Sequence, residues 1–181
     1  MVQLIETPRL NLRPFSTSDQ EHLFLLYSNP EVMGIRKIGV QTKESSDVQL
    51  QIILEHWSRK GFGLWAVFSR ETSEFMGECG LRELSPGTDE IELSYGLIPS
   101  FWGIGYASEA AIAVIEYGFM HLGLNEIFGV VNGENETSLH VLKKLGFKFE
   151  HMISEEDGTI ARSILAQDQW INARDGGSRG H

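Results

Sequence analysis

"IPSFWGIGYASEA", residues 98–110, is the stretch that decides how this chain is interpreted. A proline-led turn runs into Gly103 and Gly105, and a helix-forming segment follows at once. Glycine permits backbone dihedrals that turn successive N–H groups toward one point, and it has no side chain to block close approach. A helix start adds unpaired amides and the positive end of the helix dipole. The stretch therefore predicts an anion site for a phosphate or pyrophosphate. A tight turn whose glycines only relieve strain is the alternative.

Hydrophobic periodicity on both sides of this loop indicates alternating strands and helices in a mixed sheet. We expect strands over residues 9–15, 64–70, 74–84, 90–98, 126–132, 147–153 and 159–167, the three from 64 to 98 forming an antiparallel meander. We expect helices after Ser16 or Ser18, over 43–59, over 106–123 and from Asn135 to Gly146. In the second of these helices, apolar residues recur at roughly helical spacing: Val48, Ile52, Leu54 or Glu55, and Trp57.

Composition is that of a globular chain that is long enough for one continuous core. The 181 residues are 41% hydrophobic and 22% charged, and no run reaches the length of a membrane-spanning helix. Cys79 is the only cysteine, so we expect no disulfide and a reducing, cytoplasmic location. The formal charge of −10 disfavours nucleic acid and favours cationic partners such as amines or basic peptides. The histidines show no metal-ligand spacing, so we expect no metal.

Two known phosphate-binding motifs fit the loop poorly. The P-loop needs Gly-Lys-Ser/Thr, whereas Tyr106 and Ala107 follow Gly105, so it is excluded. The dinucleotide fingerprint nearly fits, with Ser108 in place of its third glycine. It requires parallel strands on both sides of the helix, however, and the strands that precede this loop form a meander. It is disfavoured.

Three blocks of the chain together resemble one known family. They are ETPRLNLRPFSTSDQEHLFLLYSNPEV (6–32), EIELSYGLIPSFWGIGYASEA (90–110) and VVNGENETSLHVLKKLGFKFE (130–150). Their order and spacing resemble the GNAT superfamily of acetyl-CoA-dependent N-acetyltransferases, and within it the RimJ/RimL-type branch. The resemblance covers roughly residues 5–168. The chain departs from the family's loop pattern at Trp102, where glutamine or arginine is usual.

The resemblance implies a fold, a co-substrate and a set of contacts. The fold would be a mixed α/β (α+β) one with a mostly antiparallel sheet of about six or seven strands and helices on both faces. Its splayed central strands would form the acetyl-CoA cleft. The amides of Gly103, Ile104, Gly105, Tyr106, Ala107 and Ser108 would hold the pyrophosphate. The pantetheine arm would pair with the backbone around Tyr95, Gly96 and Leu97 and contact Asn135.

The resemblance also implies two catalytic groups. Ser138, in the pattern Asn-x-x-Ser, would lie near the CoA sulfur and serve the departing thiolate. Glu92 would accept the proton of the amine, directly or through water. Both have structural alternatives: Asn135 as an N-cap with Ser138 in the first helical turn, and Glu92 as a carboxylate paired with an arginine. His151, Glu150 and Tyr95 are weaker candidates for the base. An α-amine has a pKa near 7.7–8.0 and so needs no strong base.

These inferences predict a single acetyltransferase domain over residues 1–170 and a polar tail over 171–181. Its reaction would be direct attack of a primary amine, on a protein N-terminus or a small molecule, on bound acetyl-CoA. A non-catalytic acyl-CoA-binding or sensing module is the alternative. We expect no nucleic-acid or membrane partner. The acceptor, the existence of a dedicated base and a homodimeric state stay open.

Overall fold

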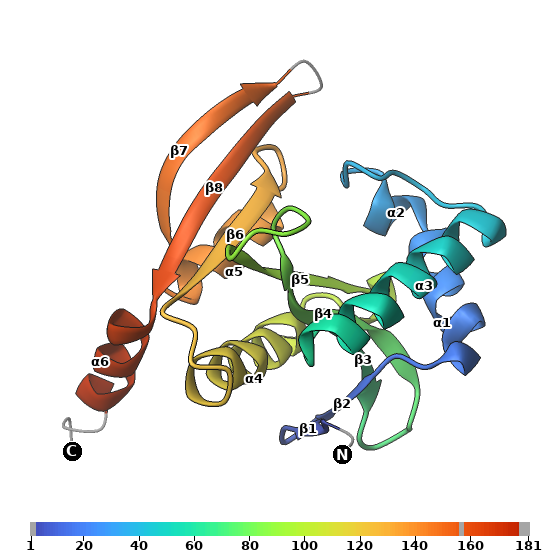
Figure 1. Cartoon of the computed structure of the whole chain (residues 1–181), viewed down its shortest axis with the longest axis horizontal. Coiled ribbons are helices and arrows are strands. Elements are labelled where there is room, and N and C mark those ends of the chain that lie inside the picture. Colours follow the sequence, from blue (N-terminus) through green and yellow to red (C-terminus); the bar gives the residue numbers. More distant parts are fainter. Residues whose placement is uncertain (1–2, 156–157, 178–181) are drawn as a thin grey trace. The chain divides into compact units, whose positions relative to one another are not determined.

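A computed structural model describes residues 3–155 and 158–177 (Figure 1). Those residues contain eight strands and six α-helices, which makes the chain an α/β protein. The strands are β1 (Ile5–Glu6), β2 (Leu10–Pro14), β3 (Leu64–Ser69), β4 (Phe75–Glu83), β5 (Ile91–Leu97), β6 (Glu126–Asn132), β7 (Lys148–Glu155) and β8 (Gly158–Ala166). The helices are α1 (Gln20–Tyr27), α2 (Pro30–Met33), α3 (Lys43–Lys60), α4 (Tyr106–Met120), α5 (Glu136–Lys144) and α6 (Gln167–Gly177), with short 3₁₀ helices η1 (Thr17–Asp19) and η2 (Pro99–Phe101).

The chain divides into two compact units. The first takes its described residues from Met1–Arg82 and Ser94–Val114, and the second from Glu83–Leu93 and Ile115–His181. Strand β5 and helix α4 each contribute residues to both units. The predicted anion loop belongs entirely to the first unit, whereas the predicted catalytic residues belong to the second.

The strands form a mixed sheet in which most of the pairs are antiparallel. The first unit has the order β1-β2-β3-β4-β5 and the second the order β5-β6-β8-β7. The pairs β1–β2, β2–β3, β3–β4, β6–β8 and β7–β8 are antiparallel, and β5 pairs parallel with β6 at Glu92 and Phe128. The predicted mostly antiparallel mixed sheet is confirmed. Its additional strand is the two-residue β1, which is too short to produce a periodic pattern.

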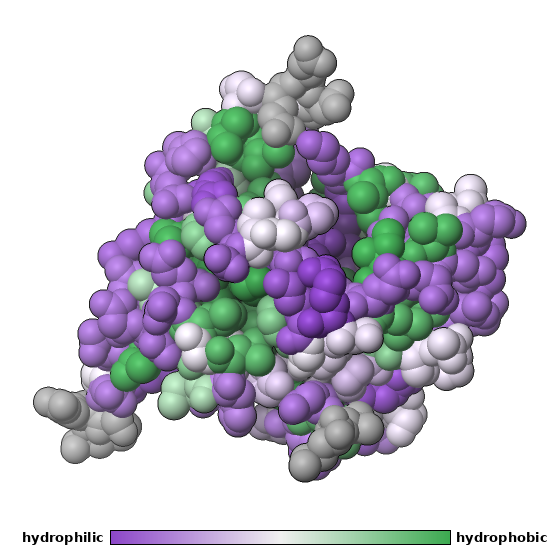
Figure 2. All heavy atoms as spheres, viewed as in Figure 1, coloured by the Kyte–Doolittle hydropathy of each residue, from purple (hydrophilic) through white to green (hydrophobic). Residues whose placement is uncertain are grey.

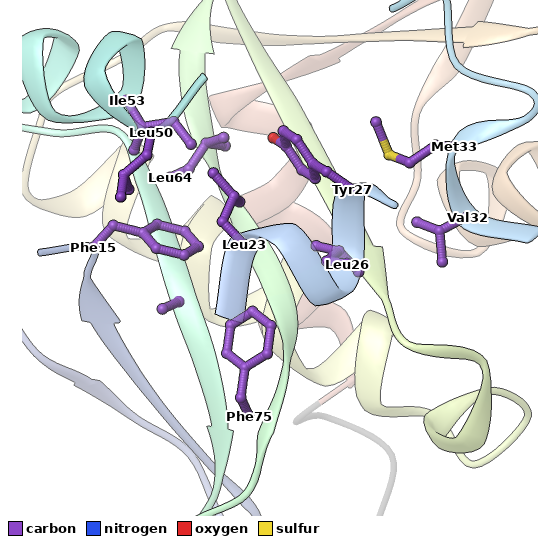
Figure 3. Close-up of a cluster of buried hydrophobic side chains, with 11 residues drawn as sticks. Phe15, Leu23, Leu26, Tyr27, Val32, Met33, Leu50, Ile53, Leu64 and Phe75 are labelled. Atoms are coloured by element: carbon purple, nitrogen blue, oxygen red, sulfur yellow. The ribbon is translucent and has the colours of Figure 1, made fainter. Parts of the chain in front are cut away.

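Apolar side chains of α1, α2 and α3 form the helical side of the core in the first unit. Figure 3 shows Leu23, Leu26 and Tyr27 of α1 gathered with residues of the neighbouring elements. Burial of a large apolar side chain contributes about 1.5–3 kcal/mol to the free energy of folding. Burial of these side chains therefore holds α1 against the rest of the cluster. Strand β2 supplies Leu10 and Leu12, both fully buried, as its predicted alternation requires.

The buried face of α3 differs from the stripe that its sequence suggests most readily. Val48 and Ile52 are 58% and 51% exposed, whereas Leu50 and Ile53 are buried and Trp57 packs against the same core. The helix carries two apolar stripes, and periodicity cannot tell which of them meets a neighbour. Figure 2 shows apolar residues among hydrophilic ones on the side of the view where α2 and α3 lie.

Helix α6 is the largest departure from expectation. Residues 171–177, predicted as part of a polar tail, continue the helix that begins at Gln167, while residues 178–181 lie outside the described residues. Trp170 is only 8% exposed and packs against Phe119, with ring centroids 6.4 Å apart. The Gln167 side chain also donates to the Phe119 carbonyl oxygen at 3.0 Å. These contacts hold a segment whose own sequence is a poor helix former.

None of the helices in residues 3–155 and 158–177 combines the length and the apolar character that crossing a membrane requires.

Candidate active site

The loop between β5 and α4 has the backbone that its glycines predict. Gly103 and Gly105 have φ of +77° and +82°, in the left-handed region that favours glycine. A Cβ at Gly103 would meet no heavy atom within 4 Å, so the backbone there is open to a ligand. The amide of Glu109 donates to the Gly105 carbonyl at 3.0 Å. Among the described residues no acceptor is recorded for the amides of residues 103–108, as is usual at a helix start.

Arg9, in the segment before β2, forms an ion pair with α4 and a hydrogen bond with this loop. Arg9 donates through Nε to Glu109 Oε2 at 2.6 Å and through Nη1 to the carbonyl oxygen of Ile104 at 3.0 Å. Its guanidinium carbon lies 4.3 Å from the ring centre of Tyr106. Glu109 Oε1 accepts from the Thr7 hydroxyl at 2.7 Å and from the Arg9 amide at 2.9 Å. Burial alone would raise the pKa of Glu109, but these hydrogen bonds outweigh it and hold the pKa below its usual value.

Trp102, the residue that departs from the family's loop pattern, has a structural role. Its indole N–H donates to the carbonyl oxygen of Leu97 at 2.7 Å, while half of the side chain stays exposed. The bond joins the loop to the end of β5. The pantetheine arm is expected to pair with the backbone at Leu97, and the carbonyl oxygen of Leu97 therefore already has one hydrogen-bond donor.

The carbonyl oxygen of Tyr95, also on β5, already accepts a hydrogen bond from Arg36. Arg36 Nη2 donates to the Tyr95 carbonyl oxygen at 2.7 Å, and the guanidinium lies where a side chain on Gly96 would stand. On the other side, the backbone of Gly96 and Leu97 lies so close to Gly77 that a Cβ on Gly77 would overlap it. Glycine is therefore required at position 77 by the close approach of the β5 backbone, whereas a Cβ at Gly96 would displace the end of the Arg36 side chain.

Arg36 belongs to a buried polar network that sequence reasoning missed. Glu78, on β4, is completely buried and accepts from Arg36 Nη1 at 2.8 Å and from the Tyr27 hydroxyl at 2.9 Å. Burial and the nearby Glu78 carboxylate raise the pKa of Tyr27 above its usual range. Burial lowers the pKa of Arg36, but the interactions with Glu78 and Tyr27 together outweigh it and the net shift is upward. A glutamate inside the apolar run FMGECGL is the signal that could have revealed the network.

In the second unit, Glu92 lies near the start of β5, at the point where β5 pairs with β6. It stands opposite Phe128 in the β5–β6 register and is only 7% exposed. A carboxylate that is withdrawn from water in this way is suited to proton exchange with a bound group.

Asn135 and Ser138 occupy the start of α5. Asn135 is the N-cap, as predicted, and its Oδ1 accepts from the Ser138 amide at 3.1 Å. The structural role of Asn135 is thus present, and its amide nitrogen can still donate elsewhere. Ser138 is partly exposed in the first helical turn, where the helix dipole favours negative charge.

Glu150, one of the weaker base candidates, is held by an arginine. Arg162 on β8 donates through Nε to Glu150 at 3.0 Å and through Nη2 to Glu90 at 2.8 Å. Its guanidinium carbon also lies 4.5 Å from the ring centre of Phe128. Glu150 and Glu90 are thus both joined to β8 through one arginine.

Comparisons with a family model and with individual proteins all match acetyltransferases. A model of the acetyltransferase (GNAT) domain matches residues 9–148. The uncharacterized N-acetyltransferase YoaA of Bacillus subtilis is 34% identical over 86% of this chain and 88% of its own length. The FsC-acetyl coenzyme A-N(2)-transacetylase of Aspergillus fumigatus is 32% identical over 92% and 77%. The spermidine N(1)-acetyltransferase of Escherichia coli K12 is 24% identical over 91% and 82%.

Solved structures agree on the fold. A GNAT-family acetyltransferase from Bacillus anthracis superposes with a TM-score of 0.79 at 23% identity, covering 92% of this chain and 99% of that one. RimL, a ribosomal L7/L12 α-N-protein acetyltransferase in complex with coenzyme A, superposes with a TM-score of 0.79 at 17% identity, covering 92% and 99%. The chain therefore belongs to the GNAT acetyltransferase family, and it is an acyltransferase that uses acetyl-CoA as its co-substrate.

Proposed function

We propose that this chain is an N-acetyltransferase that moves the acetyl group of acetyl-CoA to a primary amine. The observation that carries the proposal is the row of amides from Gly103 to Ser108. Among the described residues they have no recorded acceptor, and no side chain fills the space over Gly103. A diphosphate supplies charged acceptors for such a row, and each hydrogen bond to a charged group is worth about 1.5–3 kcal/mol. Residues 103–108 would thus anchor the nucleotide end of the co-substrate.

The pantetheine arm would follow β5 along Tyr95, Gly96 and Leu97. Because the carbonyl oxygens of Tyr95 and Leu97 already accept from Arg36 and Trp102, the arm would have to use their remaining lone pairs or the backbone of Gly96. Asn135 would donate to the arm through its amide nitrogen, since its oxygen caps α5.

The reaction needs a neutral amine and a stabilised thiolate. The neutral nitrogen forms a bond to the thioester carbonyl carbon, the carbon–sulfur bond breaks, and a proton of that nitrogen passes to the departing sulfur to give the thiol of CoA. Before this attack the ammonium form of the amine must give up one other proton. We assign that proton to Glu92, whose buried carboxylate has little water to compete with it. We assign to Ser138 a hydrogen bond to the departing sulfur, supported by its place in the first turn of α5. Residues 1–170 would act as one domain, which a family match containing residues of both units supports.

The acceptor is proposed by class only. One relative bears the name of a spermidine acetyltransferase, and one structural neighbour that of a protein α-N-acetyltransferase. Both names refer to enzymes that act on cationic primary amines, and the net charge of −10 on this chain would attract such amines. Membership of the RimJ/RimL-type branch is likewise a proposal, supported by the block at residues 6–32 and by RimL as one structural neighbour among several.

The test combines ligand binding with a matched pair of glycine variants. In a thermal-shift assay, CoA at 100 times its Kd should stabilise the protein by about 2.7 kcal/mol, and NAD should not. Gly103→Ala and Gly61→Ala introduce a Cβ at nearly the same φ, +77° and +75°, with nothing within 4 Å of either. Both should therefore cost similar stability, roughly 1–2 kcal/mol. Only Gly103→Ala should weaken CoA binding.

A thiol-release assay across polyamines and N-terminal peptides would then identify the acceptor class. Stabilisation by NAD instead of CoA, or equal CoA affinity in the two glycine variants, would refute the loop assignment. CoA binding without thiol release from any amine would refute N-acetyl transfer and leave an acyl-CoA-binding module.

A further inference from the structure

Arg9 lies beside the anion loop, and the hydrogen bonds of its side chain go to groups of the protein itself. Two of its nitrogens are bound, one to Glu109 at 2.6 Å and one to the carbonyl oxygen of Ile104 at 3.0 Å. Its planar guanidinium lies over the Tyr106 ring at 4.3 Å. The contacts span the loop on both sides of Gly105, where the backbone turns through a positive φ of 82°. A single side chain thus contacts the loop peptide, the first residue of α4 and a residue one turn later.

The bond to Ile104 determines where the next amide points. The peptide that joins Ile104 to Gly105 is planar and trans, so its C=O and N–H point in opposite directions. With the carbonyl oxygen held by Arg9 Nη1, the Gly105 N–H must point away from the guanidinium. Glycine alone would not choose this orientation, because it populates many dihedrals about equally.

Arg9 also neutralises a charge that would otherwise oppose an anion. Glu109 lies in the first turn of α4, and hydrogen bonds hold the pKa of its carboxyl below the usual value despite burial, so it is ionised at neutral pH. A bare carboxylate there would repel a diphosphate and compete for the helix amides. Thr7 and the Arg9 amide complete its hydrogen bonding, which draws the carboxylate toward the segment before β2.

We propose that Arg9 is a positioning residue for the co-substrate: it fixes the Ile104–Gly105 peptide so that its N–H faces the diphosphate of acetyl-CoA. This inference rests on the proposed function of the loop. Arg9 acts through the backbone and touches no reacting atom. Its removal should therefore weaken binding of acetyl-CoA and leave the chemical step unchanged.

The test compares Arg9→Ala with Arg70→Ala. Arg70 is a matched control because it is also exposed and donates to a backbone oxygen of the same segment, that of Thr7 at 2.8 Å, without reaching the loop. We expect Arg9→Ala to raise both the KM for acetyl-CoA and the Kd of CoA about 10- to 100-fold, the equivalent of one hydrogen bond to a charged group. The kcat at saturating acetyl-CoA and the KM for the amine should stay within about twofold. Arg70→Ala should change none of them beyond that range.

Arg9→Lys gives a second measurement that does not depend on how well the alanine variant folds. A lysine can pair with Glu109, but its single ammonium lacks the planar fork that reaches Glu109 and Ile104 together. The KM for acetyl-CoA should therefore rise in Arg9→Lys as well. Full activity of Arg9→Lys, or a fall in kcat with unchanged KM in either variant, would overturn the proposal. If the wild-type protein neither binds CoA nor releases thiol, it is the proposed function that fails.

Discussion

Replacing Arg36 by methionine would leave Glu78 as a buried charge that keeps its hydrogen bond from Tyr27 and loses the one from Arg36. Glu78 is fully buried, and its two recorded hydrogen bonds come from Arg36 at 2.8 Å and Tyr27 at 2.9 Å. Methionine keeps most of the length and apolar volume of the arginine stem, so the substitution removes mainly the guanidinium. It also releases the Tyr95 carbonyl on β5.

The size of the effect follows from burial. Breaking a buried ion pair by removing one partner costs about 3–5 kcal/mol, because the remaining charge is uncompensated. The Arg36 side chain is 22% exposed, so some water can reach Glu78 after the change. We therefore expect Arg36→Met to lower the free energy of unfolding by about 3 kcal/mol, the lower end of that range.

Urea unfolding at pH 7, followed by tryptophan fluorescence, would measure this change. Trp57 and Trp65, in the same unit as Arg36, pack edge to face with ring centroids 4.8 Å apart and would report its unfolding. The control is the double variant Arg36→Met with Glu78→Met, which leaves no buried charge. It should be more stable than Arg36→Met alone, because replacing a whole buried pair by apolar groups is often nearly neutral. A loss below about 1 kcal/mol in the single variant, or additive losses in the double one, would refute the reasoning.

Three further predictions concern other sites. Asp19 is buried and paired with Arg13 at 2.7 Å, so Asp19→Asn should cost about 2 kcal/mol at pH 7 in urea unfolding. Burial would raise the pKa of Asp19, but Arg13, His22 and the Ser16 amide lower it; the wild-type advantage should therefore shrink as pH falls below about 4, and a constant difference down to pH 2 would contradict this. Ser138→Ala should lower kcat for acetyl transfer more than it changes CoA affinity, and unchanged turnover would remove Ser138 from the mechanism. Burial raises the pKa of the Cys79 thiol, so it should react with a disulfide reagent only in denaturant; rapid reaction of the native protein would contradict its buried position.

Local sequence was sufficient for the elements that carry their own signals. The two glycines before α4, the alternation in β2 and the Asn135 cap of α5 each act over a few neighbouring residues, and each is found as predicted. The resemblance of three blocks to a known family led to the fold and the co-substrate. The proposed roles of Glu92 and Ser138 also came from that resemblance, and they stay predictions.

Contacts between distant parts of the chain were beyond such reasoning. Arg9 and Glu109 are 100 residues apart, and Arg36 and Glu78 are 42 apart. Any arginine can pair with any carboxylate, and only the tertiary fold decides which two meet. The same holds for α6, which is held in place because Trp170 is buried against Phe119. Local patterns therefore determined where the co-substrate loop lies, because backbone conformation depends on near neighbours. Which side chains hold that loop in shape was decided by tertiary packing alone.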